Sequence, residues 1–302
     1  MKNFFILFIL SFLYQAVSTA QVLEDSIVMS LGFKNALTII IPETTSKFVD
    51  AEWKEYLKPY GKVTKIKQSI ETITPDVQIL DIGGISKLTI YNRNESVTEG
   101  VKANVWIAID SGFVQSEAYP KEYVASVKWL KDFAFKVIND QITVELEAEQ
   151  KILDKFSANL TKLQKENTSL HKSIEDSKEK ITKAEADIET NLNQQEMAQK
   201  DIDNQKTIVG EIQKQSGVTS KQIDEEVKQL SKLESNLTKL KKSNDSLHKV
   251  ISDSNTRITK AEEDIITNLE NQELVQKEID NQKVVVAGVQ TKLDKASGNK
   301  PN

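Results

Sequence analysis

One seven-residue repeat of apolar side chains covers the second half of this 302-residue chain. With Leu146 taken as the first heptad position (a), one register continues from Ile142 to Leu293, and 17 of its 22 a positions are apolar. The fourth positions (d) are less regular, with 13 of 22 apolar when alanine is counted. Three or four heptads in one phase already indicate a coiled coil, so this pattern predicts a long helical coiled coil over residues 142–296.

The coiled-coil region contains an internal duplication, in which residues 159–213 match 236–290 at 35 of 55 positions. The copies are 77 residues apart, which is eleven heptads, so their apolar stripes are in phase. Between the copies, Ser216, Gly217 and Thr219 are the candidate residues of a turn at 215–220. Thr219 with Gln222 has the spacing of a capping box, which favours a new helix start there.

Two arrangements of the coiled coil fit these observations. In the favoured arrangement, an antiparallel hairpin, Asn167 lies opposite Asn268 and Asn191 opposite Asn244, so that these register-setting amides are paired rather than facing apolar residues. The alternative is a continuous rod in a parallel homodimer, where Asn167 and Asn244 pair with their own copies. The unbroken heptad phase favours the rod, since one interior glycine costs a helix only about 1 kcal/mol.

Residues 21–141 differ in composition and predict a separate head domain. Thirteen of the fourteen aromatic residues after residue 20 lie before residue 136, and no proline occurs from Lys121 to Lys300. An apolar strand, a helix beginning near Thr45 and a second helix beginning near Pro120 frame the expected strands, which lie near 62–68, 76–82, 86–93 and 101–109. The order β-α-β-β-β-β-α predicts an α+β domain with a largely antiparallel sheet.

The strand expected at 101–109 has the clearest alternation in the head. Its odd-numbered residues from Val101 to Ile109 are apolar, and they alternate with Lys102, Asn104, Trp106 and Ala108. Because successive strand residues point to opposite faces of a sheet, we expect one face to be buried and the other exposed.

The first 20 residues have the composition of a cleaved secretory signal peptide. Lys2 precedes an apolar run from Phe4 to Leu13, and small residues lead to Ala20, after which we expect cleavage. A retained N-terminal anchor is the alternative, although ten apolar residues are about half of what spans a bilayer. We therefore expect export to the periplasm or the extracellular space of a bacterium, no membrane span in the mature chain, and a disordered tail at 297–302.

Charge and residue counts argue against several functional classes. The net charge is −5, and −6 once Lys2 is removed with the signal, so no basic footprint for nucleic acid is visible. The cluster Lys62, Lys65 and Lys67 comes closest, and we interpret it as a solvated strand face. The chain has no cysteine, which excludes thiolate nucleophiles, cysteine zinc sites and disulfides.

The sequence predicts no catalytic, cofactor-binding or metal-binding residues. The only histidines, His171 and His248, occupy the same e position of the two repeat copies, beside the seam. No phosphate-binding, dinucleotide-binding or hydrolase-elbow motif occurs. Asp76, Asp81 and Asp110 lie at the ends of expected strands, where we interpret them as turn residues; a calcium site or a carboxylate pair is the alternative.

The aromatic residues Trp53, Tyr56 and Tyr60 recur at helical spacing in the head. We interpret them as core residues of the first helix rather than as a platform for a ligand.

The sequence thus favours a non-enzymatic, exported scaffold or protein-interaction protein of the cell envelope. Its coiled coil would act as a spacer, an oligomerisation element or a partner-binding arm, paired with itself as a hairpin or as a parallel homodimer. The partner is an unidentified protein. One alternative is a head that binds a ligand or is a small catalytic module, with the coil setting only the oligomeric state. A periplasmic holdase chaperone is the third hypothesis.

Overall fold

The computed structural model of the protein describes residues 21–110 and 112–298. The predicted signal peptide and residues 299–302 of the predicted tail lie outside the described residues. The described residues form two compact units: one holds those up to Asp154 together with those from Asp280 to Gly298, and the other is Lys155–Ile279.

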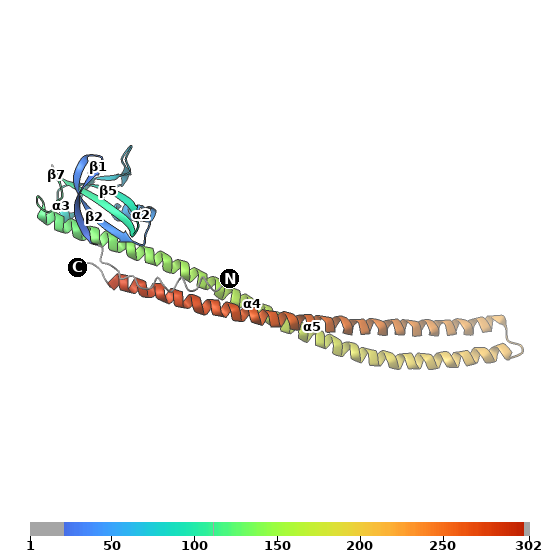
Figure 1. The fold of residues 1–302 in the computed structure, drawn as a ribbon. Coiled ribbons are helices and arrows are strands. Elements are labelled where there is room, and N and C mark those ends of the chain that lie inside the picture. Colours follow the sequence, from blue (N-terminus) through green and yellow to red (C-terminus); the bar gives the residue numbers. More distant parts are fainter. Residues whose placement is uncertain (1–20, 111, 299–302) are drawn as a thin grey trace. The chain divides into compact units, whose positions relative to one another are not determined.

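An antiparallel sheet forms the head, as predicted (Figure 1). Its strand order is β1-β2-β6-β5-β4-β3, with β7 paired to the end of β6. The strands are β1 (Val22–Met29), β2 (Gly32–Pro42), β3 (Thr64–Lys65), β4 (Thr72–Val77), β5 (Leu88–Val97), β6 (Gly100–Ile109) and β7 (Gly112–Phe113). Every pairing between neighbouring strands is antiparallel, because adjacent strands are mostly joined by short turns.

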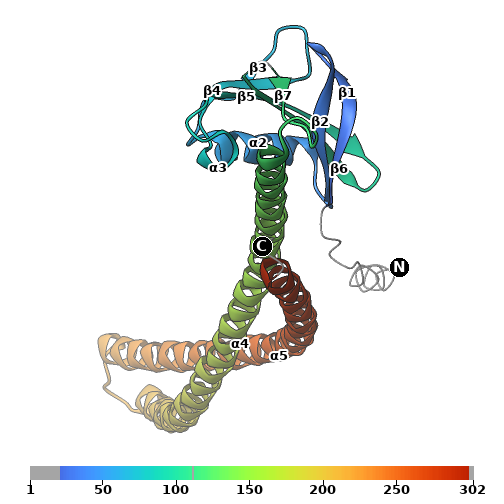
Figure 2. The same cartoon turned by 90° about the vertical axis from the view of Figure 1, so that its left-hand side faces the viewer.

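Helix α2 (Ser46–Leu57) and the first turns of α4 (Pro120–Lys214) cover one face of this sheet, as Figure 2 shows. Thr45 caps α2 by accepting a hydrogen bond from the Phe48 backbone N–H at 3.3 Å. Trp53 of α2 lies edge-on to Phe133 of α4, with ring centroids 4.9 Å apart. The main core therefore lies between the two helices and one face of the sheet.

Several strand predictions need correction. Residues 76–82 are not one strand, because β4 ends at Val77 and residues Leu80–Gly83 form the short helix α3. The predicted order also lacks β1 and β7. Strand β4 contains Pro75 and Asp76 at a shift in its pairing with β5, and such bulges are where a strand tolerates proline.

The second face of the sheet is also covered, contrary to the expectation for the strand at 101–109. Trp106 and Asn104 are buried although they lie on the face opposite the helices. Met29 of β1 and Ala36 of β2 pack against Trp106, and the Trp106 indole N–H donates to the Lys34 carbonyl oxygen at 3.3 Å. The β1–β2 hairpin therefore supplies a second, smaller core.

The head unit also contains the beginning of the helical pair. Ile142 of α4 packs with Val289 and Ala296 of α5 (Ser220–Gly298) in a small apolar cluster. The Lys292 ammonium group lies 2.7 Å from a carboxylate oxygen of Glu43, which follows β2. Helix α5 continues to Gly298, two residues beyond the predicted end of the coiled coil, and the predicted boundary at residue 141 falls inside α4.

Helices α4 and α5 form a hairpin, because they are joined by a short turn and contact each other. Within the second unit, Lys206 of α4 lies 3.8 Å from Glu234 of α5. Between the helices, Gly217 has a φ of +91°, a left-handed conformation that glycine adopts without the steric penalty other residues have. The hairpin is thus the observed arrangement.

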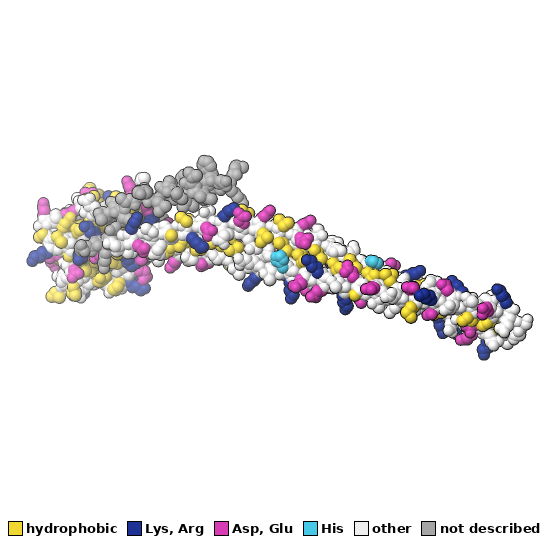
Figure 3. All heavy atoms as spheres, turned by 90° about the horizontal axis from the view of Figure 1, so that it is seen from below, with side chains coloured by type: hydrophobic (Ala, Val, Ile, Leu, Met, Phe, Trp, Pro, Cys, Tyr) yellow, Lys and Arg dark blue, Asp and Glu magenta, His cyan; other side chains and the backbone are white. Residues whose placement is uncertain are grey.

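The predicted heptad register describes the burial of the whole helical pair. From Ile142 to Leu293, every a and d residue is buried or half-buried except Ser216 and Thr219, which lie at the turn. His171 and His248 are exposed, as their flanking e positions require. Figure 3 shows that acidic and basic side chains are interspersed over the visible face of the helical region.

Candidate functional site

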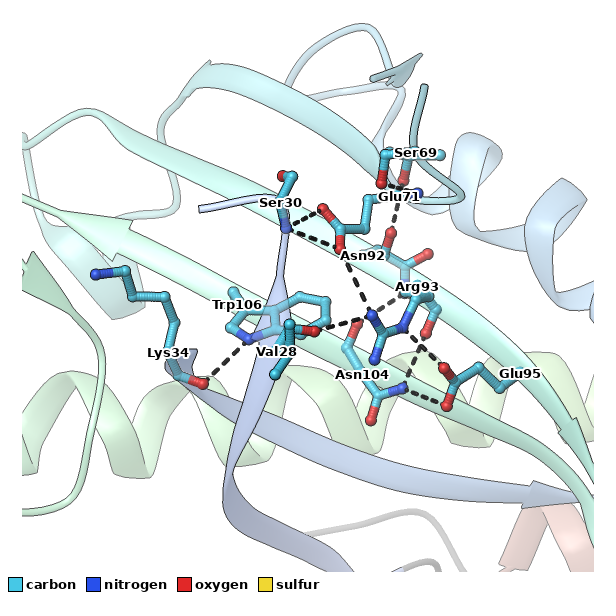
Figure 4. Close-up of polar contacts among 11 residues, drawn as sticks. Val28, Ser30, Lys34, Ser69, Glu71, Asn92, Arg93, Glu95, Asn104 and Trp106 are labelled. Carbon is cyan, nitrogen blue, oxygen red and sulfur yellow. Dashed lines mark hydrogen bonds and ion pairs between the residues drawn. The ribbon is translucent and has the colours of Figure 1, made fainter. Parts of the chain in front are cut away.

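Two neighbouring turns of the head form the most distinctive surface of the described residues. The first joins β1 to β2 and the second joins β3 to β4; we call residues 28–34 and 65–71 together the paired turns. They meet through Glu71, whose two carboxylate oxygens accept hydrogen bonds from the Ser30 backbone N–H at 3.1 and 3.0 Å. Figure 4 shows Ser30 facing Glu71 beside the end of β1.

Arg93 of β5 completes the junction between the turns. Its guanidinium group donates to the Val28 carbonyl oxygen at 2.9 Å and lies 3.6 Å from Glu71. Its Nε atom lies 2.8 Å from Glu95, without the alignment of a hydrogen bond. The guanidinium carbon also sits 5.4 Å from the ring centroid of Trp106. Glu71 is only 2% exposed, so its charge is paired rather than presented to solvent.

A buried polar chain continues from this junction across the sheet. The Asn104 side-chain amide donates to Glu95 at 3.2 Å, and the Thr38 hydroxyl donates to the Asn104 oxygen at 3.1 Å. These residues come from three different strands, β5, β6 and β2. The network therefore ties the β1–β2 hairpin to the rest of the sheet and holds the paired turns in place.

The paired turns expose apolar side chains outward. Leu31 is 53% exposed, Phe33 is 72% exposed and Ile70 is 76% exposed. Val28 lies directly across from Phe33 in the β1–β2 pairing and is half exposed. Leu31 and Ile70 are the chain neighbours of Ser30 and Glu71, so the hydrogen bonds between the turns bring the two apolar groups to one end of the head.

No sequence motif marks this surface, because Glu71 and Arg93 belong to none. A usable signal was present, since Arg93 is one of two arginines in a chain with 40 basic residues. Arginine presents a rigid fork of donors and is weakly hydrated, which suits a partly buried ion pair better than lysine. A lone arginine inside a predicted strand of a lysine-rich chain therefore indicates a buried carboxylate partner.

The helical pair carries polar residues in its seam at equivalent positions of the two repeat copies. Within the second unit, the Gln205 side-chain amide donates two hydrogen bonds to Glu226: one to its carboxylate at 2.6 Å and one to its backbone carbonyl oxygen at 3.2 Å. Within the head unit, Gln282 makes the same two contacts with Glu149, at 2.6 and 3.1 Å. Both residues of the second pair are 77 positions from their counterparts. The two contacts are therefore equivalent under the 77-residue offset, although Glu149 and Glu226 each precede the duplicated segments.

The four predicted register asparagines lie in the seam but hydrogen-bond differently from the expected amide pairs. Asn191 and Asn268 are each 7% exposed and accept a bond at 2.6 Å from the glutamine four residues later in their own helix. The Asn167 side-chain nitrogen and the Asn244 side-chain oxygen are buried without a hydrogen-bond partner. Their role in setting the register stays a prediction.

At the predicted turn, the Thr219 backbone N–H and hydroxyl both donate to the Gln222 side-chain oxygen, at 3.0 and 2.9 Å. This is one of the two hydrogen bonds of a capping box: the glutamine side chain, three residues after the capping residue, accepts from that residue's backbone N–H. Ser216 and Gly217 are exposed beside it. The sequence thus located the residues that separate α4 from α5.

The three candidate aspartates lie in different elements: Asp76 is in β4, Asp81 is in α3 and Asp110 directly follows β6. Asp76 and Asp110 have left-handed φ values of +57° and +47°, which aspartate tolerates better than most residues. Asp76 also forms an exposed ion pair with Lys87 at 3.2 Å. Among the described residues, no group of three or more histidine, cysteine, aspartate or glutamate side chains could hold a metal ion.

The aromatic residues of the first helix divide between core and surface. Trp53 is buried, and the Tyr56 hydroxyl donates to the Trp129 carbonyl oxygen at 3.0 Å. Burial, assisted by the charges of Asp132 and Tyr60, raises the pKa of the Tyr56 phenol well above its ordinary value. Tyr60 lies beyond the end of α2 and is partly exposed, so the prediction of a continuous core stripe was wrong for this residue.

Within the described residues, none of the helices is both long and apolar enough to cross a membrane. No protein-family model, no curated protein and no solved structure matches this chain.

Proposed function

We propose that this protein is a non-enzymatic scaffold or interaction protein of the bacterial cell envelope, exported by a cleaved signal peptide, in which the helical hairpin acts as a spacer or a partner-binding arm. The supporting observation is that the two long helices pack their apolar side chains against each other. Helices α4 and α5 comprise 95 and 79 residues, and their a and d side chains pack into one mutual seam. The remaining positions are mostly polar, which suits an element that provides reach.

Shortening both arms by matched segments tests the spacer role. Deleting residues 170–197 and 238–265 removes four whole heptads from each helix, so the heptad phase, the turn and the head unit are kept. We expect the shortened protein to fold and remain exported, but to lose in-cell photo-crosslinks from probes placed at the turn, while probes on the head keep theirs. Unchanged crosslinks at the turn would contradict the spacer role.

Export is tested separately by N-terminal sequencing of the full chain expressed in a bacterium. We expect the mature protein to begin at Gln21 and to appear in the periplasmic or extracellular fraction. Recovery of the uncleaved chain from the cytoplasm would reject export.

A ligand-binding head is the second candidate, and one observation favours it. The Ser126 hydroxyl, the Trp129 indole N–H and the Thr74 hydroxyl are buried without a hydrogen-bond partner. Ser126 and Trp129 lie one turn apart on α4, and a buried unpaired polar group costs about 1–3 kcal/mol. A small polar molecule could offset this cost.

Thermal unfolding in the presence of a metabolite collection distinguishes the two candidates. If the head is a ligand-binding module, one compound should raise the midpoint of the fluorescence transition equally in the full and the shortened protein. Loss of that shift in a Ser126→Ala variant would locate the compound at α4, and turnover of the compound would reject the non-enzymatic proposal.

A further inference from the structure

The paired turns combine exposed apolar side chains with a local excess of positive charge. Residues 26–42 and 60–71, which include both turns, contain one acidic residue, Glu71, and four lysines: Lys34, Lys62, Lys65 and Lys67. The chain as a whole has 45 acidic and 40 basic residues, so these segments differ from the average surface. Glu71 is buried against Arg93, so its own charge is not exposed at the turns; the carboxylate of Glu95 on the other side of Arg93 is paired with the same guanidinium group.

The geometry places charge and apolar groups side by side. The turn from Ile66 to Glu71 is closed by a hydrogen bond from the Ile66 N–H to the Glu71 carbonyl oxygen at 3.0 Å, and Lys67 and Ile70 both lie exposed within it. Lys65 precedes this turn at the end of β3 and is also exposed. Lys65 and Lys67 therefore lie in the same short segment as the exposed Ile70, and the Ser30–Glu71 hydrogen bonds join that segment to the first turn.

The size of the apolar group distinguishes between classes of partner. A standard protein–protein interface buries about 800 Å² on each partner, with about 20–30 residues a side. Four side chains on two turns are far fewer. Peripheral membrane binding needs less, because a small buried apolar area adds to the attraction between lysines and anionic headgroups.

The polar junction beneath the turns also lowers the cost of binding. Ser30, Glu71, Val28 and Arg93 hold the two turns together before any contact with a partner is made (Figure 4). A surface that is already ordered loses less conformational freedom when it binds.

From these observations we infer that the paired turns form a docking site for an anionic phospholipid bilayer. Leu31, Phe33 and Ile70 enter the boundary between headgroups and acyl chains, and Lys65 and Lys67 contact lipid phosphates. Membrane docking of the paired turns depends neither on the role of the helical hairpin nor on export, because both surfaces of a cytoplasmic membrane contain anionic lipids.

The direct test is co-sedimentation of residues 21–302 with phosphatidylcholine vesicles that contain or lack phosphatidylglycerol. We expect binding only to the vesicles with phosphatidylglycerol, and loss of binding at high salt, which screens headgroup charge. A Lys65→Glu/Lys67→Glu variant should bind at least about 25-fold more weakly, since each lysine near an anionic surface contributes about a factor of five. A Leu31→Ser/Phe33→Ser/Ile70→Ser variant should lose about a hundred-fold.

Matched controls carry the same substitutions elsewhere on the head. Leu80→Ser/Ile85→Ser changes two exposed apolar residues at α3, and Lys47→Glu/Lys54→Glu changes two exposed lysines of α2. Both controls should bind as tightly as the unmodified chain. A Phe33→Trp variant adds a direct readout, because the three native tryptophans are buried and the new indole is the one that should shift to shorter emission wavelength on vesicles.

The lipid assignment is overturned by any of three results. These are equal binding to both vesicle types, equal loss in the control variants, or no vesicle binding together with turn-dependent binding to double-stranded DNA or to an acidic protein. The variants change exposed side chains, and an unchanged tryptophan-fluorescence melting curve verifies that each one is folded.

Discussion

The head and the helical hairpin differ in the kind of contact that holds each together. In the head, decisive contacts join residues that are far apart in sequence, such as Arg93 with the carbonyl group of Val28, 65 residues away. In the hairpin, one heptad rule states which side chain is buried at nearly every position. A sheet domain therefore depends on a few specific non-local contacts, whereas a coiled coil spreads its stability over many equivalent layers.

This difference predicts different responses to damage. Removing one side chain from the main core of the head should weaken the whole domain, because that core is one connected cluster between the sheet and two helices. Removing one layer of the hairpin should act mainly on neighbouring layers, as in repeat proteins, where stability is nearly a sum of local terms. The two regions can be followed separately, since all three tryptophans lie in the head and most of the helical residues lie in the hairpin.

The largest expected effect is on the head core. Phe133→Ala removes a fully buried ring that packs against Trp53 and Tyr56, and should destabilise the head by about 3–5 kcal/mol. The fluorescence transition should move to lower denaturant concentration while most of the helical circular dichroism is retained. Ile181→Ala in the hairpin is the control, and it should leave the fluorescence transition in place. Simultaneous loss of both signals in Phe133→Ala would show that the two regions unfold as one.

The next prediction concerns the turn that separates the arms. Gly217→Ala should favour a continuous helix by about 2 kcal/mol per chain, because alanine is strained at the left-handed φ of this residue and is the better helix former. The heptad phase continues through the turn, so two chains with straightened turns can exchange arms and form the same layers between them. Light scattering should then show twice the monomer mass.

Gly217→Asn is the matched control for this prediction, since asparagine tolerates the left-handed conformation and should keep the chain monomeric. If Gly217→Ala stays monomeric at every concentration tested, the turn is not what separates the hairpin from an exchanged dimer.

A smaller effect tests the equivalence of the two arms. Gln205→Leu leaves Glu226 without its partner and should cost about 1–2 kcal/mol, and Gln282→Leu should cost the same because Glu149 is the equivalent residue. Adding Glu226→Leu to Gln205→Leu should recover most of the loss, since two apolar residues replace both polar partners. Chemical denaturation followed by circular dichroism measures these values. Unequal costs would show that the copies have diverged in packing despite their shared sequence.

The smallest predicted effect is a pH dependence confined to the head. Burial raises the pKa of Tyr56 in the folded protein above its unfolded value near 10, so the unfolded chain loses this proton first. The corresponding stability is complete below about pH 10 and declines as the pH rises further. Fluorescence melting midpoints should fall above about pH 10 in the unmodified chain and fall less in Tyr56→Phe. Identical slopes in both proteins would contradict this assignment.

Prediction from sequence succeeded where the physical rule was local. A helix was expected to begin near Thr45, where Thr44, Thr45 and Ser46 each offer a hydroxyl that can cap free N–H groups, and in the structure Thr45 is the capping residue. The strand β1 was missed because Glu24 and Asp25 interrupt its apolar pattern. In the structure, the Glu24 carboxylate accepts a hydrogen bond from the side-chain amide of Asn35 on the neighbouring strand, at 3.2 Å. Only the pairing of β1 with β2 reveals why a carboxylate is stable there.

The same limit explains the error over Trp106. Alternation along β6 correctly predicted that Trp106 lies on the face opposite Val105, but it could not say what covers that face. Met29 and Ala36 do so, and they come from a hairpin 70 or more residues earlier in the chain. The junction of Ser30, Glu71 and Arg93 has the same origin, which is why no motif indicated the paired turns.

The sequence by itself therefore determined the heptad register of the helical region and the division into a head and a helical region, and it offered 215–220 as a candidate turn, whereas the choice of a hairpin over a continuous rod came from the structure. These follow from periodicity and backbone preference, which act over a few residues and are visible in one dimension. The tertiary structure alone decided which face of the sheet is covered, which carboxylate Arg93 neutralises and which apolar side chains stay exposed at the paired turns. Those outcomes depend on strand order and burial, because the energy of a charge or an apolar group is set by neighbours from distant parts of the chain.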